Sequence, residues 1–290
     1  MVIEYQEDVL LSFGFKDKNI KGKIVKLKKI PKELLSRFSV SKEIDKLFIE
    51  TSALSCVISS NFKFDGTFKL QLNCYNAPVK VILCDNKQNG NTRSYISIDE
   101  LELEKIKNKD DLTFQDLVGN GQMIFHMLPQ YAHEPYQAII PLSGENISAC
   151  VNSWFENSEQ VTTFTKAWSS VKKGVVVVIF LQKIADNYAT EDMQEQNQND
   201  FNTVKILTES LSYKEAMEDN LEEILYNLYN EFEVLLYPKT YFYDSCSCSI
   251  EKIQEVLKTI PIDEINEIKA ENDGFVKINC DFCKKEYKVQ

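Results

Sequence analysis

The sequence predicts an α+β fold in which a mixed helix and strand core is followed by a partly helical acidic segment and a small C-terminal domain. Three observations predict this organisation. Short β-type runs alternate with helical patterns up to about Lys183, all of the excess negative charge lies in one later stretch, and half of the eight cysteines lie in the last 45 positions. With 43% apolar residues among 290, the chain can bury a core of ordinary size.

Branched and aromatic residues dominate five runs of the core that we expect to be strands, at residues 57–72, 79–83, 95–98, 123–128 and 175–181. Apolar residues recur at helical spacing in residues 31–38, 42–54 and 147–155. Phe64-Asp65-Gly66 predicts a hairpin turn inside the first run, and Gly119-Asn120-Gly121 precedes a later strand.

The acidic segment contains 13 acidic residues against two lysines between residues 186 and 236. Residues 187–202 are rich in Gln, Asn and acids and predict an exposed loop or linker. An amphipathic helix is predicted after it, because six apolar residues recur at three- and four-residue spacing: Leu221, Ile224, Leu225, Leu228, Phe232 and Leu235.

The C-terminal domain begins near Cys246 and is predicted to contain short helices and a hairpin. Ser249 can cap a helix that ends before Pro261. Asn272-Asp273-Gly274 predicts a turn into a strand at residues 275–278, directly before the last two cysteines.

Two close thiol pairs, C-x-C and C-x-x-C, are separated by 31 residues in this domain. Each pair supplies two sulfurs from one tight loop, so the two pairs together can complete a tetrahedral four-thiolate shell around one Zn²⁺. A tail of this size is near the limit below which a domain needs a metal or disulfides to fold. We therefore predict a zinc-binding C-terminal domain with the ligands Cys246, Cys248, Cys280 and Cys283.

A zinc ion with a purely structural role is the main alternative for this cluster. A thioredoxin-like C-x-x-C is excluded, because that motif lies at a helix N-terminus and only seven residues follow Cys283.

No catalytic residue is predicted. Four other thiols lie at wide spacing in apolar surroundings and are expected to be core residues: Cys56, Cys74, Cys84 and Cys150. His126 and His133 are the only histidines, and neither lies near a nucleophile motif. The Gly-rich phosphate-binding motifs are absent from the sequence, so ATP is not expected as a ligand.

The net charge and the hydropathy of the sequence limit which partners and which cellular location we expect. The net charge of −11 opposes binding to nucleic acid, and the longest apolar run, residues 175–181, is too short to span a membrane. The N-terminus lacks the basic start of a signal peptide, and the cysteine distribution favours a reducing compartment. We therefore expect a cytoplasmic protein.

Several short motifs, in their order and spacing, resemble the 33 kDa chaperonin family, the redox-regulated heat-shock chaperones of bacteria. Besides the two cysteine pairs they are Lys63-Phe64-Asp65-Gly66, Leu70-Gln71-Leu72, Leu117-Val118-Gly119-Asn120-Gly121, Tyr136-Gln137, Ser153-Trp154-Phe155, Ser158-Glu159-Gln160, residues 225–229 and Leu257-Lys258-Thr259-Ile260-Pro261. The likeness covers nearly the whole chain.

The resemblance implies a chaperone that holds unfolded or partly unfolded client proteins without ATP. It implies that the reduced, zinc-bound form is inactive, and that oxidation turns the four thiolates into two disulfides, releases zinc and destabilises a linker. The client-binding core then corresponds to residues 1–185, the metastable linker to 186–245 and the redox-switch domain to 246–290. The resemblance also allows a homodimer of the activated form.

After zinc release the two halves of the tail can separate, so we expect neighbours to pair, Cys246 with Cys248 and Cys280 with Cys283. The competing function from another class is a zinc-ribbon adaptor that binds nucleic acid or a protein partner. A thiol oxidoreductase comes third, because neither the required helix nor a general base is evident.

Overall fold

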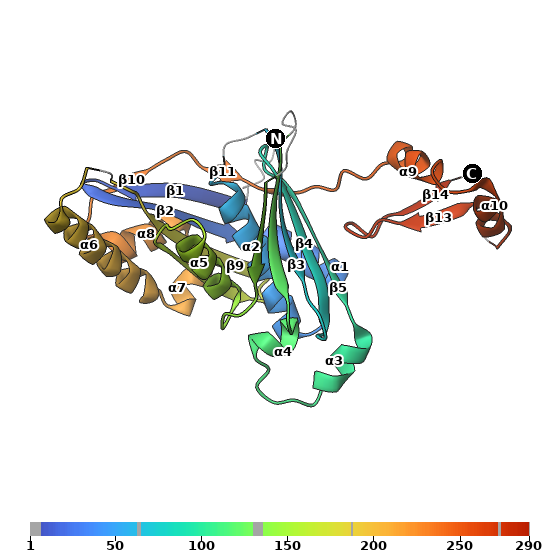
Figure 1. The fold of residues 1–290 in the computed structure, drawn as a ribbon, viewed down its shortest axis with the longest axis horizontal. Coiled ribbons are helices and arrows are strands. Elements are labelled where there is room, and N and C mark those ends of the chain that lie inside the picture. The colour runs from blue at the N-terminus through green and yellow to red at the C-terminus, as the bar shows by residue number, and fades with distance from the viewer. Residues whose placement is uncertain (1–6, 63–64, 130–135, 187, 272–273, 290) are drawn as a thin grey trace. The chain divides into compact units, whose positions relative to one another are not determined.

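The computed structural model describes residues 7–62, 65–129, 136–186, 188–271 and 274–289 (Figure 1). They form two compact units, Met1–Asp244 and Ser245–Gln290. Helices and strands alternate as the predicted α+β class requires. Within the described ranges, no helix is both long enough and apolar enough to cross a membrane.

One six-stranded sheet of the first unit has the order β10-β1-β2-β9-β8, with β11 also paired to β1. Its strands are Val9–Phe15 (β1), Lys18–Leu27 (β2), Thr163–Ser170 (β8), Val175–Lys183 (β9), Val234–Leu236 (β10) and Thr240–Tyr241 (β11). The predicted strand at 175–181 is confirmed as β9. Val177 and Ile179 point into one apolar cluster, and Val178 and Phe180 into another, so both faces are buried and the sequence is continuously apolar.

The second sheet has the order β12-β5-β4-β3-β6-β7. Its strands are Gly66–Asn73 (β3), Val79–Lys87 (β4), Asn91–Ile98 (β5), Gln122–Pro129 (β6), Tyr136–Pro141 (β7) and Tyr243–Asp244 (β12). Gly119-Asn120-Gly121 precedes β6, as predicted, and its first position needs glycine. Gly119 has a φ of +53°, and a Cβ there would lie 2.3 Å from the carbonyl oxygen of Tyr75.

Helix α2 (Lys42–Ser59) packs against β4 of the second sheet and β9 of the first. The helices α1 (Lys29–Phe38) and α5 (Ile147–Asn157) complete this side, and both confirm predictions. The shorter α3 (Glu100–Ile106) and α4 (Phe114–Val118) connect β5 to β6.

The prediction of a strand over 57–72 is wrong in its first part. α2 continues to Ser59, with Val57 and Ile58 fully buried, and the strand begins only at Gly66. Burial on both sides of α2 outweighs the preference of these β-branched residues for strands. The segment between α2 and β3 is therefore a helix-to-strand connection and not a hairpin turn; Lys63 and Phe64 of the quoted motif lie outside the described residues.

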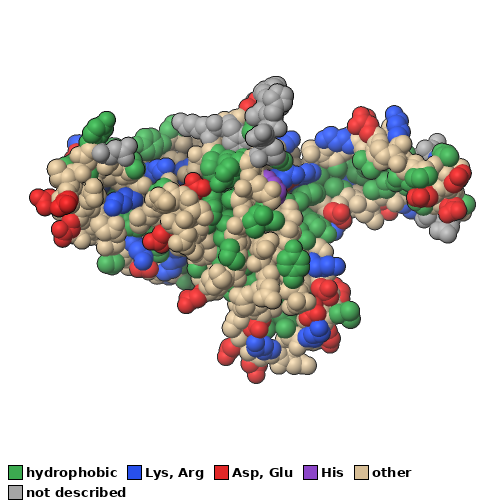
Figure 2. All heavy atoms as spheres, viewed as in Figure 1, with side chains coloured by type: hydrophobic (Ala, Val, Ile, Leu, Met, Phe, Trp, Pro, Cys, Tyr) green, Lys and Arg blue, Asp and Glu red, His purple; other side chains and the backbone are tan. Residues whose placement is uncertain are grey.

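The acidic segment forms a layer of three helices: α6 (Glu191–Glu209), α7 (Tyr213–Glu218) and α8 (Leu221–Tyr229). They share an apolar cluster with β1, β2 and β9, on the sheet face opposite α2. Figure 2 shows acidic side chains gathered at the α6 end of this unit, on the solvent side.

Two predictions for this segment need correction. Residues 191–202 are helical rather than a loop, because Thr190 caps α6 and Phe201, Val204 and Thr208 anchor its second half. The predicted helix at 221–235 ends at Tyr229, since Val234–Leu236 pair with β1 as β10, which leaves Leu235 41% exposed. The first four apolar positions of its stripe are buried as expected.

A buried lysine fastens α7 to the sheet. The Nζ of Lys26, on β2, donates to the carbonyl oxygens of Ala216 at 2.9 Å, Met217 at 3.1 Å and Asp219 at 2.6 Å. Burial lowers the pKa of Lys26 to about 8, so the ammonium form still predominates at neutral pH. Three carbonyls at the helix C-terminus, which have no partner within the helix, are thereby satisfied.

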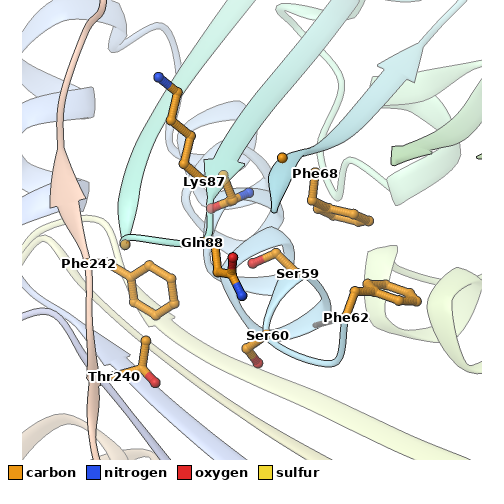
Figure 3. Close-up of a pocket in the computed structure, with 11 residues that line it drawn as sticks. Ser59, Ser60, Phe62, Phe68, Lys87, Gln88, Thr240 and Phe242 are labelled. Atoms are coloured by element: carbon orange, nitrogen blue, oxygen red, sulfur yellow. The ribbon is translucent and has the colours of Figure 1, made fainter. Parts of the chain in front are cut away.

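The last eleven residues of the first unit, 234–244, form a strap that joins both sheets. Its strands β10 and β11 pair with β1, and β12 pairs in parallel with β5. Phe242 is buried between them, and with Thr240 and Gln88 it lines a cavity of about 170 Å³ at the end of α2 (Figure 3). Asp244 ends the strap in a 2.7 Å ion pair with Arg37 of α1.

We expect the substitution Lys26→Met to loosen α7, because three carbonyl groups lose their donor. The expected loss is about 2 kcal/mol of local stability. Hydrogen exchange of the α7 amides measures it, and Lys21→Met, at an exposed position of the same strand, is the matched control. Equal exchange in the two variants would show that Lys26 does not hold the helix.

Candidate metal centre

The C-x-C half of the site lies in the loop before α9 (Ile250–Leu257). Ser249 caps this helix as predicted, since its hydroxyl accepts from the backbone N–H of Lys252. The Lys252 side chain turns back and donates to the carbonyl oxygen of Ser247 at 2.7 Å. These two bonds shape the loop that carries Cys246 and Cys248.

The C-x-x-C half lies in the turn of a hairpin made by β13 (Val276–Asn279) and β14 (Glu286–Val289). The N–H of Cys280 donates to the carbonyl of Lys285 at 3.0 Å, and the N–H of Lys284 donates to the carbonyl of Cys280 at 2.8 Å. This tight turn presents both sulfurs on one side. Asn272 and Asp273, of the turn predicted before β13, lie outside the described residues.

The four sulfurs come together from the two halves. Those of Cys246 and Cys280 are 3.6 Å apart, those of Cys248 and Cys283 are 3.4 Å apart, and all four lie within 4.8 Å of one another. A tetrahedral Zn²⁺ shell with bonds of about 2.3 Å needs sulfurs about 3.8 Å apart. The spacing fits one metal ion, and it is too wide for a disulfide.

The electrostatics of the cluster also call for a cation. Partial burial opposes ionisation of Cys248, but hydrogen bonds from Tyr287 and the neighbouring thiols lower its pKa to about 7. Burial and the hydrogen bonds that it shares with the other thiols raise the pKa of Cys283 to about 12, and similar causes raise that of Cys246. Four thiolates at this distance repel one another, so they can all ionise only around a positive ion.

The unit around the site buries little apolar surface. Among its described residues, the buried apolar and aromatic side chains are Ile265, Val276, Tyr287 and Val289. No side chain of α9 is buried, and α10 (Ile262–Glu271) buries Ile265. A core of this size does not hold a domain together without a cross-link.

The remaining cysteines are core residues, as predicted. Cys56, Cys74, Cys84 and Cys150 are all buried, and burial raises the pKa of each thiol. The Cys84 thiol contributes further to the rise at Cys56, so these two are neighbours, which the sequence did not indicate. Protonated, buried thiols are poor nucleophiles.

His126 lies on β6, and partial burial, followed by the charge of Lys69, lowers its pKa. His133 lies outside the described residues. Among the residues that the structure describes, the four C-terminal cysteines form the one cluster of three or more side chains able to share a metal ion.

A sequence model of the family described as Hsp33 protein matches residues 8–290. The chain belongs to the Hsp33 family. The 33 kDa chaperonins of Yersinia pestis (strain Pestoides F) and Yersinia pseudotuberculosis (serotype O:1b) are each 27% identical to it over 284 residues, which cover 97% of this chain and 91% of theirs. It is therefore a chaperone of this family, and the resemblance noted from the motifs is confirmed.

The fold of this Hsp33 family member is also similar to a crystal structure of the 33 kDa chaperonin from Thermotoga maritima. The TM-score is 0.78 at 16% identity, and the match covers 98% of this chain and 94% of the other. At that identity the likeness bears on the fold.

Sequence reasoning missed one residue of the site. The Tyr287 hydroxyl lies 3.0 Å from the Cys248 sulfur, although 39 positions separate the two residues. One feature of the sequence could have indicated it: Tyr287 lies four positions after Cys283 in a strand pattern, where alternation places it on the same side as Val289.

Removal of metal by a chelator under reducing conditions should unfold residues 245–290 and leave the sheets of the first unit intact, because the sulfurs then lose the ion that joins the two halves. Hydrogen exchange read separately on β13–β14 and on β4 and β9 checks this. Full protection of β13–β14 in metal-free protein would contradict it.

Proposed function

We propose that this chain is a redox-regulated, ATP-independent holdase that binds unfolding proteins under oxidative stress. The observation that carries the proposal is a four-thiol cluster in a unit with almost no core of its own. Oxidation of such a cluster removes the cross-link on which the fold of that unit depends. Membership of the Hsp33 family supports the chaperone part.

The proposed metal is one Zn²⁺ per chain, bound by Cys246, Cys248, Cys280 and Cys283 in the reduced form. Four sulfur donors at tetrahedral spacing favour zinc over metals that prefer oxygen. The bound ion would keep all four thiolates deprotonated and close together. The sulfurs would then be held in a folded unit as thiolates, which is the form that reacts with an oxidant.

The oxidation itself can be balanced with a peroxide as oxidant. One sulfur attacks a peroxide oxygen and becomes a sulfenic acid, while hydroxide leaves; a second thiolate then displaces hydroxide from that sulfur and forms the S–S bond. Each disulfide takes two electrons from two thiolates and consumes one peroxide. Two protons from the solvent convert the two hydroxides to water.

We propose that the final disulfides join sequence neighbours, Cys246 to Cys248 and Cys280 to Cys283. Two short sulfur–sulfur distances run between the halves, 3.6 Å from Cys246 to Cys280 and 3.4 Å from Cys248 to Cys283. That arrangement depends on a shared ion. Once the ion leaves, the halves separate and the thiol in the same loop is the nearest partner.

The proposed division of labour assigns client binding to residues 1–185, a metastable linker to 186–245 and the redox switch to 246–290. The helices α6–α8 cover an apolar face of the first sheet that includes Phe13, Ile24 and Val177. Their outer side carries most of the net negative charge, so the layer is held by its apolar side against charge repulsion. Its loss would uncover a large apolar surface for a client.

Proposed partners are unfolded or partly unfolded proteins, with a homodimer as an option for the activated form. The proposal includes no nucleic acid, membrane or ATP and a cytoplasmic location. The alternative, a zinc-ribbon adaptor for nucleic acid or a protein, is disfavoured for nucleic acid because residues 246–290 contain seven lysines and nine acidic residues.

Peroxide should convert reduced protein with about one zinc per chain into a form that suppresses aggregation of an unfolded client without ATP. The double variant Cys280→Ser/Cys283→Ser should lose both the zinc and the switch. The matched control Cys74→Ala, which removes a buried thiol elsewhere, should keep both. Zinc content near zero in the wild type, or switching in the double variant, would refute the assignment.

Oxidation should also increase cleavage within residues 186–245 in limited proteolysis, because the unfolded C-terminal unit no longer anchors the strap, which ends two positions before Cys246. Peptide mapping of the same samples identifies the disulfides. Bridges between the two halves, or unchanged cleavage in this range, would show that the proposed order of events is wrong.

A further inference from the structure

The side chain of Tyr287 contacts a sulfur of the candidate metal centre. It lies on β14, opposite Ile278 of β13, and only 9% of its surface is exposed. Its hydroxyl is 3.0 Å from the Cys248 sulfur and 3.3 Å from the Cys248 carbonyl oxygen. The contact therefore connects the hairpin of the C-x-x-C half to the loop of the C-x-C half.

The Tyr287 hydroxyl has one hydrogen atom and two acceptors within reach, the sulfur and the carbonyl oxygen of Cys248. A sulfur that binds a metal ion carries no hydrogen, so the phenolic O–H is the donor between these two groups. The ammonium of Lys285 lies 5.0 Å from the centre of the Tyr287 ring. A cation over the ring withdraws electron density and makes the hydroxyl a stronger donor.

Two other sulfurs receive their hydrogen bonds from the backbone. The N–H of Cys248 reaches the Cys246 sulfur, and the N–H of Lys285 reaches the Cys283 sulfur. Both donors are backbone N–H groups, so a side-chain substitution does not remove them. The hydroxyl bond to Cys248 is different, because one substitution can remove it.

We propose that Tyr287 is a positioning residue of the switch, whose hydroxyl engages a lone pair of the Cys248 sulfur and thereby slows the attack of this sulfur on an oxidant. A sulfur that shares its charge with a donor is a weaker nucleophile, so its step to the sulfenic acid is slower while the electron balance given above is unchanged. The redox meaning of this role rests on the proposed function; the effect on sulfur reactivity does not.

The test is Tyr287→Phe in the full-length reduced, metal-loaded protein. Time-resolved mass spectrometry after a pulse of N-ethylmaleimide or peroxide gives a rate for each cysteine. We expect the rate at Cys248, relative to that at Cys246, to rise about three- to tenfold, the effect of one lost hydrogen bond. Tyr226→Phe, at a site that is 71% exposed in α8, is the control and should leave the ratio unchanged.

A second variant keeps the test decisive if Tyr287→Phe loses its metal. Lys285→Met retains the hydroxyl but removes the cation over the ring, and should raise the ratio by less than Tyr287→Phe. The inference would be overturned by a ratio within about twofold of the wild type in metal-loaded Tyr287→Phe, or, if that variant loses its metal, by no rise at all in Lys285→Met. If the ratio rises but peroxide never produces a holdase, the proposed function fails and the role of Tyr287 stands.

Discussion

The mutual repulsion of four thiolates is the constraint on which the C-terminal unit depends. Their sulfurs lie within 4.8 Å of one another, so all four can be ionised together only around a cation. A bound ion would also replace the core that the unit lacks, since few of its described side chains are buried. One interaction therefore sets the electrostatics of the site and the folding of the surrounding chain. Chemistry at a single sulfur is enough to disturb both.

The stability of the helix layer α6–α8 in the first unit depends on two opposed contributions, apolar burial and charge repulsion. Its inner side buries Phe201, Val204 and Ile224 against the sheet, and three backbone carbonyls of its middle helix accept from a buried lysine. Its outer side concentrates negative charge, which favours expansion. The layer is ordered because its apolar contacts with the sheet outweigh this repulsion, so its stability depends on docking.

The cluster of four cysteines was predictable because two sulfurs in one tight loop are a local property of the sequence, readable from spacing alone. The contact between Cys248 and Tyr287 was not, since it depends on how a hairpin packs against a distant loop. The same limit explains the errors in the fold. Val57 and Ile58 were assigned to a strand because they are β-branched, but burial between two sheets makes them helical. Most of residues 191–202 show no apolar spacing, because the residues that anchor α6, such as Phe201 and Val204, lie in its second half. Where one face of a helix is buried, as in α8, the periodicity of the apolar residues was sufficient to predict it.

The strap at 234–244 occupies the free edges of two sheets at once, beside β1 and beside β5. Cys246 follows its last residue by two positions, so there is almost no slack between the strap and the metal ligands. A molecule whose strap has come away carries two rows of unpaired backbone donors and acceptors, which are templates for any extended chain, including that of a second copy. Pairing of the strap is thus what keeps both sheet edges closed in the first unit.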